Sequence, residues 1–229
     1  MEREYRETLQ RIILYRKSCH VSQKRMGDFL GITQSQYSKM ELGRLDIPFW
    51  VVKVWAHIGW DIDYFVTGRI RQDTDTGFRG LFGSHTYGDE PEVLRIILLA
   101  VYAAKETERT FCDERRALEQ LMKEPGKDVL FCSARQLNGM SQEVMSQCLG
   151  IGLRKYRRME RGLERPDFRT LVMLYKVSSY IPWLFIDYEE GRCRMAQYIW
   201  TALDEVSQNK VRTFIEVSCT AYEKNGKTE

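Results

Sequence analysis

Cysteine and histidine are the residues of this sequence with the widest chemical range. Metal knuckles and redox pairs need two thiols within a few residues of each other, and here no two cysteines lie closer than 16 residues. We therefore expect reduced, partly buried thiols, no metal site and no cofactor. A disulfide, or a zinc site assembled by folding, is the alternative. The cysteines are Cys19, Cys112, Cys132, Cys148, Cys193 and Cys219, and the histidines are His20, His57 and His85.

The densest charge in the sequence is a run of cations in its second half. Five of the eight residues from Arg154 to Arg161 are Lys or Arg, and Arg165 follows them. Arginine at this density suits phosphate neutralisation or bidentate pairing with guanine, so the segment predicts contact with nucleic acid. A solvated basic surface with no partner is the alternative.

Residue patterns typical of enzymes are missing from the sequence. It contains no nucleophile elbow, metal cluster or paired carboxylates at a usable spacing. The glycines at 77, 80 and 83 are not preceded by a strand or followed by Lys-Ser/Thr, so they do not form a phosphate loop. We expect a protein that is not an enzyme and has no evident small-molecule ligand.

The elements that position these residues are expected to be helices, which gives an all-α fold class. Apolar residues recur at helical spacing through most of the chain, without sustained alternation of the strand type. Residues 4–18, 92–123 and 191–223 each predict one helix. The glycine-rich residues 68–91 predict a linker with three apolar residues as a docking spot, namely Phe78, Leu81 and Phe82.

An internal repeat becomes visible when the sequence is shifted by 119 residues against itself. The match runs without a gap from Arg16 on Arg135 to Phe49 on Phe168. Between these ends Ser22-Gln23 matches Ser141-Gln142, Leu30-Gly31-Ile32 matches Leu149-Gly150-Ile151, and Met40-Glu41 matches Met159-Glu160. A match of this density indicates that one structural unit occurs twice.

The first copy of this unit predicts two short helices joined by a tight turn. Ser22 is suited to cap the first helix, with Met26, Phe29 and Leu30 as its apolar positions. Gly31 ends this helix, because glycine readily adopts the left-handed conformation of a C-terminal cap. Thr33 then caps a second helix whose Tyr37 and Met40 point inward. Gly27 is small enough for a close helix crossing, and Ser146 takes its place in the second copy.

The sequence here resembles the Cro/repressor-type (XRE) helix-turn-helix family. The resemblance rests on Arg16, Ser22 to Thr33 and Met40 to Gly43 in copy one. In copy two it rests on Arg135, Ser141 to Ile151 and Met159 to Gly162. It implies two lambda-repressor-like DNA-binding heads. The expected boundaries are 1–68 for head one, 69–91 for a linker, 92–124 for a long connecting helix, 125–188 for head two and 189–229 for a helical tail.

The resemblance also implies which residues contact DNA. The recognition helices would span about 33–42 and 152–161, entering the major groove. Gln34 matches a position that reads a base, and glutamine can pair bidentately with adenine; the alternative is a solvated polar helix face. The full candidate set is Gln23, Thr33, Gln34, Ser35, Gln36, Ser38, Lys39, Arg44, Gln142, Leu153, Arg154, Lys155, Arg157, Arg158 and Arg161.

Two charge pairs, Arg16 with Glu41 and Arg135 with Glu160, suggest acid–base chemistry by residue type. The resemblance instead implies ion pairs that tie the first helix of each head to its recognition helix. Gly152 replaces the usual capping Ser or Thr, so we expect the second recognition helix to start less firmly. Head two would then add affinity more than sequence discrimination.

The total charge names no partner, since 35 Lys and Arg against 32 Asp and Glu give only +3. The longest apolar run has nine residues and the N-terminus is charged, so we expect no membrane span, no signal peptide and a cytoplasmic location. The expected function is sequence-specific binding of double-stranded DNA by a transcriptional regulator, a repressor rather than an activator. A homodimer through 92–123 or 191–223 is a further expectation.

The main alternative is a protein–protein module, antitoxin-like or an adaptor, in which one or both heads no longer read DNA. Five tryptophans near the ends of the heads are compatible with a protein partner, although most of them should be core. They are Trp50, Trp55, Trp60, Trp183 and Trp200.

Overall fold

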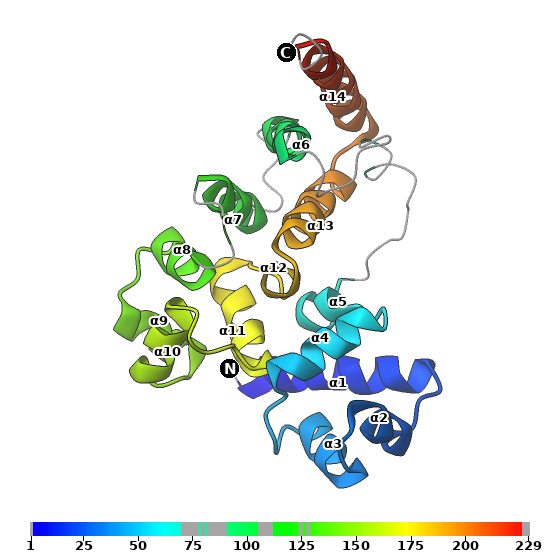
Figure 1. The fold of residues 1–229 in the computed structure, drawn as a ribbon, viewed down its shortest axis with the longest axis vertical. Coiled ribbons are helices and arrows are strands. Elements are labelled where there is room, and N and C mark those ends of the chain that lie inside the picture. Colours follow the sequence, from blue (N-terminus) through cyan, green and yellow to red (C-terminus); the bar gives the residue numbers. More distant parts are fainter. Residues whose placement is uncertain are drawn as a thin grey trace.

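A computed structural model describes residues 2–69, 78, 81, 91–104, 112–123, 126 and 129–225 of the chain. In this part of the chain all regular elements are helices and there is no strand, which confirms the all-α class (Figure 1). No helix in the described ranges is long and apolar enough to cross a membrane.

The first repeat consists of five helices that precede the glycine-rich segment. They are α1 (Glu2–Ser18), α2 (Gln23–Leu30), α3 (Gln34–Glu41), α4 (Phe49–His57) and α5 (Ile62–Thr67). Its core includes Tyr37 and Met40, both buried as expected, and a stacked pair of Trp55 and Trp60 with ring centroids 5.5 Å apart. Of the three apolar positions expected on α2, Met26 and Leu30 are buried, whereas Phe29 is 57% exposed.

The second repeat follows the same order. Its helices are α8 (Leu130–Leu137), α9 (Gln142–Leu149), α10 (Leu153–Glu160), α11 (Phe168–Ser178) and α12 (Trp183–Ile186). Helices α9 and α10 begin and end 119 residues after α2 and α3, and α11 begins 119 residues after α4. The sequence repeat is therefore matched by the helix boundaries.

The remaining four helices differ from those expected in this part of the chain. In place of one helix over 92–123 there are α6 (Pro91–Ala104) and α7 (Cys112–Lys123), which pack against each other. In place of one helix over 191–223 there are α13 (Tyr188–Thr201) and α14 (Glu205–Asn225). The second break has a local cause, because the Asp204 carboxylate accepts a hydrogen bond from the amide of Ser207 at 2.7 Å and so starts a new helix.

These four helices extend the molecule away from the repeats. Helix α13 packs on α6, α7 and α12, and α14 packs on α6 at the far end of the long axis (Figure 1). Of the apolar residues expected to dock from the linker, Phe78 is buried with its ring 6.3 Å from that of Trp200, and Leu81 is half-buried. Phe82 lies outside the described residues.

Candidate nucleic-acid interface

Helices α2 and α3 are fixed at a tight turn by their caps. The Ser22 hydroxyl accepts the amide of Arg25 at 3.1 Å, and Gly31 adopts a left-handed φ of +67° at the end of α2. A Cβ atom on Gly27 would lie 2.9 Å from the Ile32 carbonyl oxygen, so glycine permits the close approach of the turn. Thr33 and Gln36 form a reciprocal capping box that starts α3.

The corresponding pair α9 and α10 has a weaker second cap. Ser141 caps α9 through the amide of Val144, and Gly150 has a left-handed φ of +69°. Gly152, at the start of α10, has no side chain that could cap the helix, and no side-chain cap hydrogen bond is present there. Because Lys155 stands three residues later and can only donate, it cannot complete a capping box.

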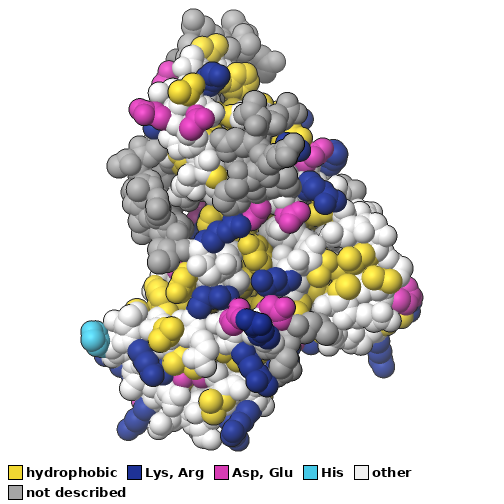
Figure 2. Space-filling model, turned by 180° about the vertical axis from the view of Figure 1, so that it is seen from behind, with side chains coloured by type: hydrophobic (Ala, Val, Ile, Leu, Met, Phe, Trp, Pro, Cys, Tyr) yellow, Lys and Arg dark blue, Asp and Glu magenta, His cyan; other side chains and the backbone are white. Residues whose placement is uncertain are grey.

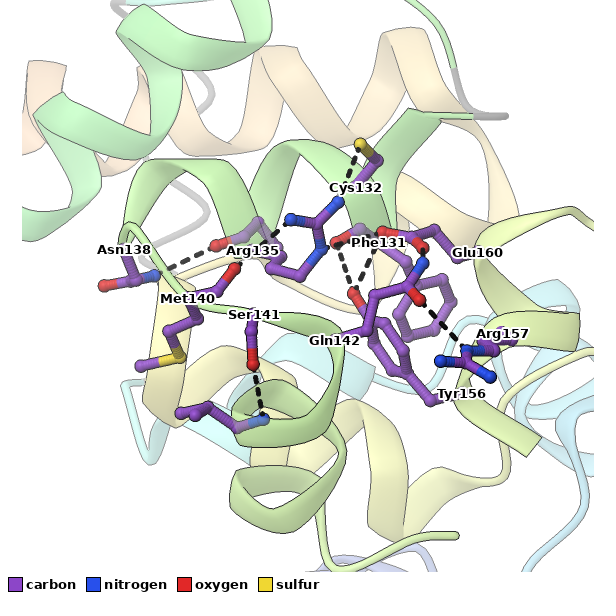
Figure 3. Close-up of polar contacts among 12 residues, drawn as sticks. Phe131, Cys132, Arg135, Asn138, Met140, Ser141, Gln142, Tyr156, Arg157 and Glu160 are labelled. Carbon is purple, nitrogen blue, oxygen red and sulfur yellow. Dashed lines mark hydrogen bonds and ion pairs between the residues drawn. The ribbon is translucent and has the colours of Figure 1, made fainter. Parts of the chain in front are cut away.

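Each recognition-helix candidate is tied to its first helix by the expected ion pair. In the first repeat, Arg16 Nε donates to Glu41 Oε1 at 2.6 Å and Nη2 to Oε2 at 3.1 Å, with both side chains buried. The hydrogen bond to Glu41 raises the pKa of Arg16 above its ordinary value. In the second repeat, Arg135 Nε donates to Glu160 Oε1 at 2.9 Å in a half-buried setting (Figure 3).

Two glutamines of the candidate DNA-contact set, Gln23 and Gln142, extend these ion pairs. Gln23 Nε2 donates to Glu41 Oε2 at 2.7 Å. Gln142 donates to Glu160 and accepts a hydrogen bond from Arg157 Nε at 3.1 Å (Figure 3). In this structure the two amides are thus directed toward carboxylates, a role that the sequence did not predict.

Helix α3 presents an exposed polar face beyond its cap. Gln34, Ser35 and Lys39 are exposed and Ser38 is half-buried, whereas Thr33 and Gln36 use their side chains in the capping box. Arg44, in the turn after the helix, is exposed. Lys39 and Arg44 form no ion pair among the described residues. This face combines hydrogen-bonding groups with two uncompensated cations.

Helix α10 presents its cations differently from the sequence expectation. Three of them are paired with carboxylates: Lys155 with Asp167 at 2.7 Å, Arg157 with Glu143 at 3.4 Å and Arg158 with Glu164 at 3.0 Å. Leu153 is half-buried against the repeat. Within the described ranges only Arg154 and Arg161 of the five cations have no ion pair.

The acidic partners on this helix surface were missed at the level of sequence. Glu143 follows the capping serine by two residues, and Glu164 lies six residues beyond Arg158. Within residues 154–161 Lys and Arg outnumber the acidic residues, so the sequence indicated a net positive helix. The compensating carboxylates come from α9 and from the turn after α10, which only folding brings beside α10. One feature of the sequence could have indicated Glu164 as a partner: in Glu160-Arg-Gly-Leu-Glu164 the charged residues alternate in sign.

The two repeats contact each other directly. The Phe168 amide donates to the Ile47 carbonyl oxygen at 2.8 Å, and the rings of Trp55 and Phe168 meet edge to face at 6.2 Å. Arg169 lies 3.4 Å from Asp46. On the face seen in Figure 2, Lys and Arg side chains are frequent over the lower half, where the repeats lie.

The His, Cys, Asp and Glu side chains in the described part of the chain form no cluster that could bind a metal ion. No group of three or more His, Cys, Asp or Glu side chains is close enough there to hold a metal ion. Among the described residues, Cys19, Cys132, Cys148 and Cys193 form no disulfide. Burial raises the pKa of the Cys193 thiol above its ordinary value, so a smaller fraction of it is the reactive thiolate at neutral pH.

Comparison of the chain with protein-family models, with curated proteins and with solved structures gave no match. What the molecule does must therefore be inferred from its own residues and their geometry.

Proposed function

We propose that this chain binds double-stranded DNA in a sequence-specific manner and regulates transcription, as a repressor rather than an activator. The observation that carries the proposal is the exposed polar face of α3, with Gln34, Ser35, Lys39 and Arg44 on a helix held by a capping box and a buried ion pair. A helix held in this way presents its exposed side chains in fixed positions, as entry into the major groove requires.

The resemblance of both repeats to the Cro/repressor-type helix-turn-helix family supports the same function. Heads of this type bind half-sites about one helical turn apart. Here both heads belong to one chain and contact each other through Ile47, Phe168 and the Asp46–Arg169 pair, so one chain would bind both half-sites. Because α3 carries Gln34 and Ser35 where α10 carries Leu153 and Arg154, the two half-sites are expected to differ.

The proposal places the chain in the cytoplasm, with access to DNA. The four cysteines whose state is described form no disulfide, which agrees with a reducing compartment. It assigns the chain no catalytic activity and no cofactor.

Selection of binding sites from random duplexes at moderate salt tests the proposal. We expect an enriched motif with two unlike halves, and recovery of no motif would contradict sequence-specific binding. Gln34→Ala should relax one base position, whereas Gln10→Ala, which changes an exposed glutamine on α1, should leave the motif intact. Arg157→Ala should weaken binding to all sequences alike.

A second candidate function is a protein–protein module formed by the second head. It is favoured by the ion pairs that compensate three cations of α10, and by the exposed apolar side chains of Val144 and Leu163 near that helix. In that case a chain with Arg154→Ala and Arg161→Ala would keep its full DNA affinity. Loss of affinity in this variant would instead assign the second head to DNA.

A further inference from the structure

The junction of the two repeats has two edges that the sequence repeat relates to each other. Residues 46–50 correspond to 165–169 under the shift of 119 residues. These segments meet where the Phe168 amide donates to the Ile47 carbonyl oxygen. At one edge, residues 46–48 of the first repeat lie beside the start of α11. At the other edge, the equivalent residues 165–167 of the second repeat lie beside the start of α4.

One edge is electrically compensated. Asp46 lies 3.4 Å from Arg169, and the Arg169 guanidinium also stacks 4.4 Å above the ring centre of Tyr5. The cation of this edge thus has both a carboxylate and an aromatic face.

The other edge has lost that compensation. Arg165 stands where the first copy has Asp46, and Trp50 stands where the second copy has Arg169. This edge opens into a groove of about 620 Å³ whose charged lining residues are Lys53, Lys155, Arg165 and Asp167. Lys155 and Asp167 pair at 2.7 Å, which leaves Lys53 and Arg165 without an ion pair among the described residues. The groove accordingly carries an excess of two positive charges.

The walls of the groove suit an oxyanion. The first turn of α4 borders it and has Pro48 at its N-cap, with no side-chain cap hydrogen bond. The related helix α11 is capped by Asp167, which accepts the amide of Thr170 at 2.8 Å. The indole of Trp50, 44% exposed, forms an apolar wall beside the two cations.

We propose that this groove binds a phosphate group, held by Lys53 and Arg165. The phosphate belongs either to the DNA backbone that passes between the two heads or to a small phosphate-bearing compound. The DNA form rests on the proposed function and refines it, because it adds a contact between the half-sites that neither recognition helix supplies. The small-compound form is independent of DNA.

Two measurements on the full chain test the site. In the first, inorganic pyrophosphate is titrated while tryptophan fluorescence is followed, because Trp50 lines the groove. The response should vanish in Trp50→Phe, and affinity should fall about tenfold in Lys53→Gln/Arg165→Gln through loss of the charged contacts. The matched control is Lys176→Gln/Lys210→Gln, which removes two exposed cations outside the groove and should bind as the parent chain.

In the second measurement the salt dependence of binding to a random-sequence duplex is compared among the same variants. If the groove holds backbone phosphates, the groove variant lowers the slope of log K against log salt by about 2 and the control variant does not. A pyrophosphate response with an unchanged slope assigns the site to a small phosphate compound. If neither pyrophosphate affinity nor the slope distinguishes the groove variant from its control, the proposal is wrong. A chain that binds no DNA is still tested by the first measurement, so the two proposals fail separately.

Discussion

The Glu143 carboxylate lies 3.4 Å from Nη2 of Arg157, on the surface where the second head would meet DNA. Glu164 compensates Arg158 in the same way at 3.0 Å. A phosphate that approaches either arginine must compete with a carboxylate already in place. The folded surface around α10 is thus less positive than the Lys and Arg residues of the helix alone would suggest.

Removing the two carboxylates should strengthen DNA binding. We expect Glu143→Gln/Glu164→Gln to raise affinity for any duplex and to steepen its salt dependence by up to about 2, because two arginines become free to neutralise phosphate. Fluorescence anisotropy at several salt concentrations measures both quantities. Glu205→Gln on α14 removes an exposed carboxylate far from the heads and serves as control. An unchanged slope would mean that α10 does not lie against the phosphates.

The buried ion pair of the first repeat should matter more for stability than its counterpart. Glu41→Gln leaves the buried Arg16 cation without its carboxylate, which costs about 3 kcal/mol of unfolding free energy. Glu160→Gln should cost less, because Arg135 is more accessible to water. Urea denaturation compares the two, with Glu7→Gln in an exposed ion pair expected to change stability by less than about 0.5 kcal/mol. Equal losses for Glu41→Gln and Glu160→Gln would contradict the ranking.

The sequence repeat predicted the short helices that recur 119 residues apart, because caps and glycine turns are local signals. Ser22, Gly31 and Thr33 fix α2 and α3 within 12 residues, and the same spacing marks α9 and α10. The Arg16–Glu41 and Arg135–Glu160 ion pairs could also be predicted from the sequence, through the resemblance. By contrast, the break at Asp204 was missed because a single capping carboxylate competes with a long apolar stripe on both sides of it.

Contacts between distant residues could not be predicted from the sequence. Asp63 and Arg194 are 131 residues apart, and nothing in either local pattern indicates that α5 packs near α13. The junction groove is likewise set by the packing of two copies, although the replacement of Asp46 by Arg165 in the repeat was visible as a change of charge.

The caps of the two recognition-helix candidates give a reciprocal prediction. Thr33→Ala should cost about 1 kcal/mol, because the capping box is lost and amides at the start of α3 lose their acceptor. Gly152→Ser should stabilise the chain by a few tenths of a kcal/mol, since the backbone at Gly152 already has the extended conformation of a cap and a Cβ there meets open space. Thermal unfolding measures both, and a destabilising Gly152→Ser would show that serine cannot cap α10.

Homodimerisation through α6 and α14 remains a prediction with a specific surface. A groove of about 550 Å³ lies between these helices, and Leu99 and Phe214 beside it are 42% and 53% exposed. A two-fold dimer needs a self-complementary surface. Here the Phe214 ring of one copy could enter the groove of the other copy, and the reverse. Phe214→Lys should therefore shift the chain to monomer in sedimentation analysis, whereas Phe29→Lys, at another exposed phenylalanine, should not. A parent chain that is monomeric at high concentration would exclude this dimer.

The pH dependence of stability should carry the signature of Asp63. Its side chain is fully buried, and burial raises its pKa to about 7 although Arg194 opposes the shift from 3.5 Å. Between about pH 4 and 7 the folded chain therefore holds a proton that the unfolded chain has released, so the unfolding free energy falls as pH rises, by up to about 1.4 kcal/mol per unit. Asp63→Asn keeps the shape and removes this titration, so its stability relative to the parent chain should increase from pH 4 to pH 8 in urea denaturation. Parallel profiles for the two chains would show that Asp63 stays ionised in the fold, with Arg194 as a sufficient partner.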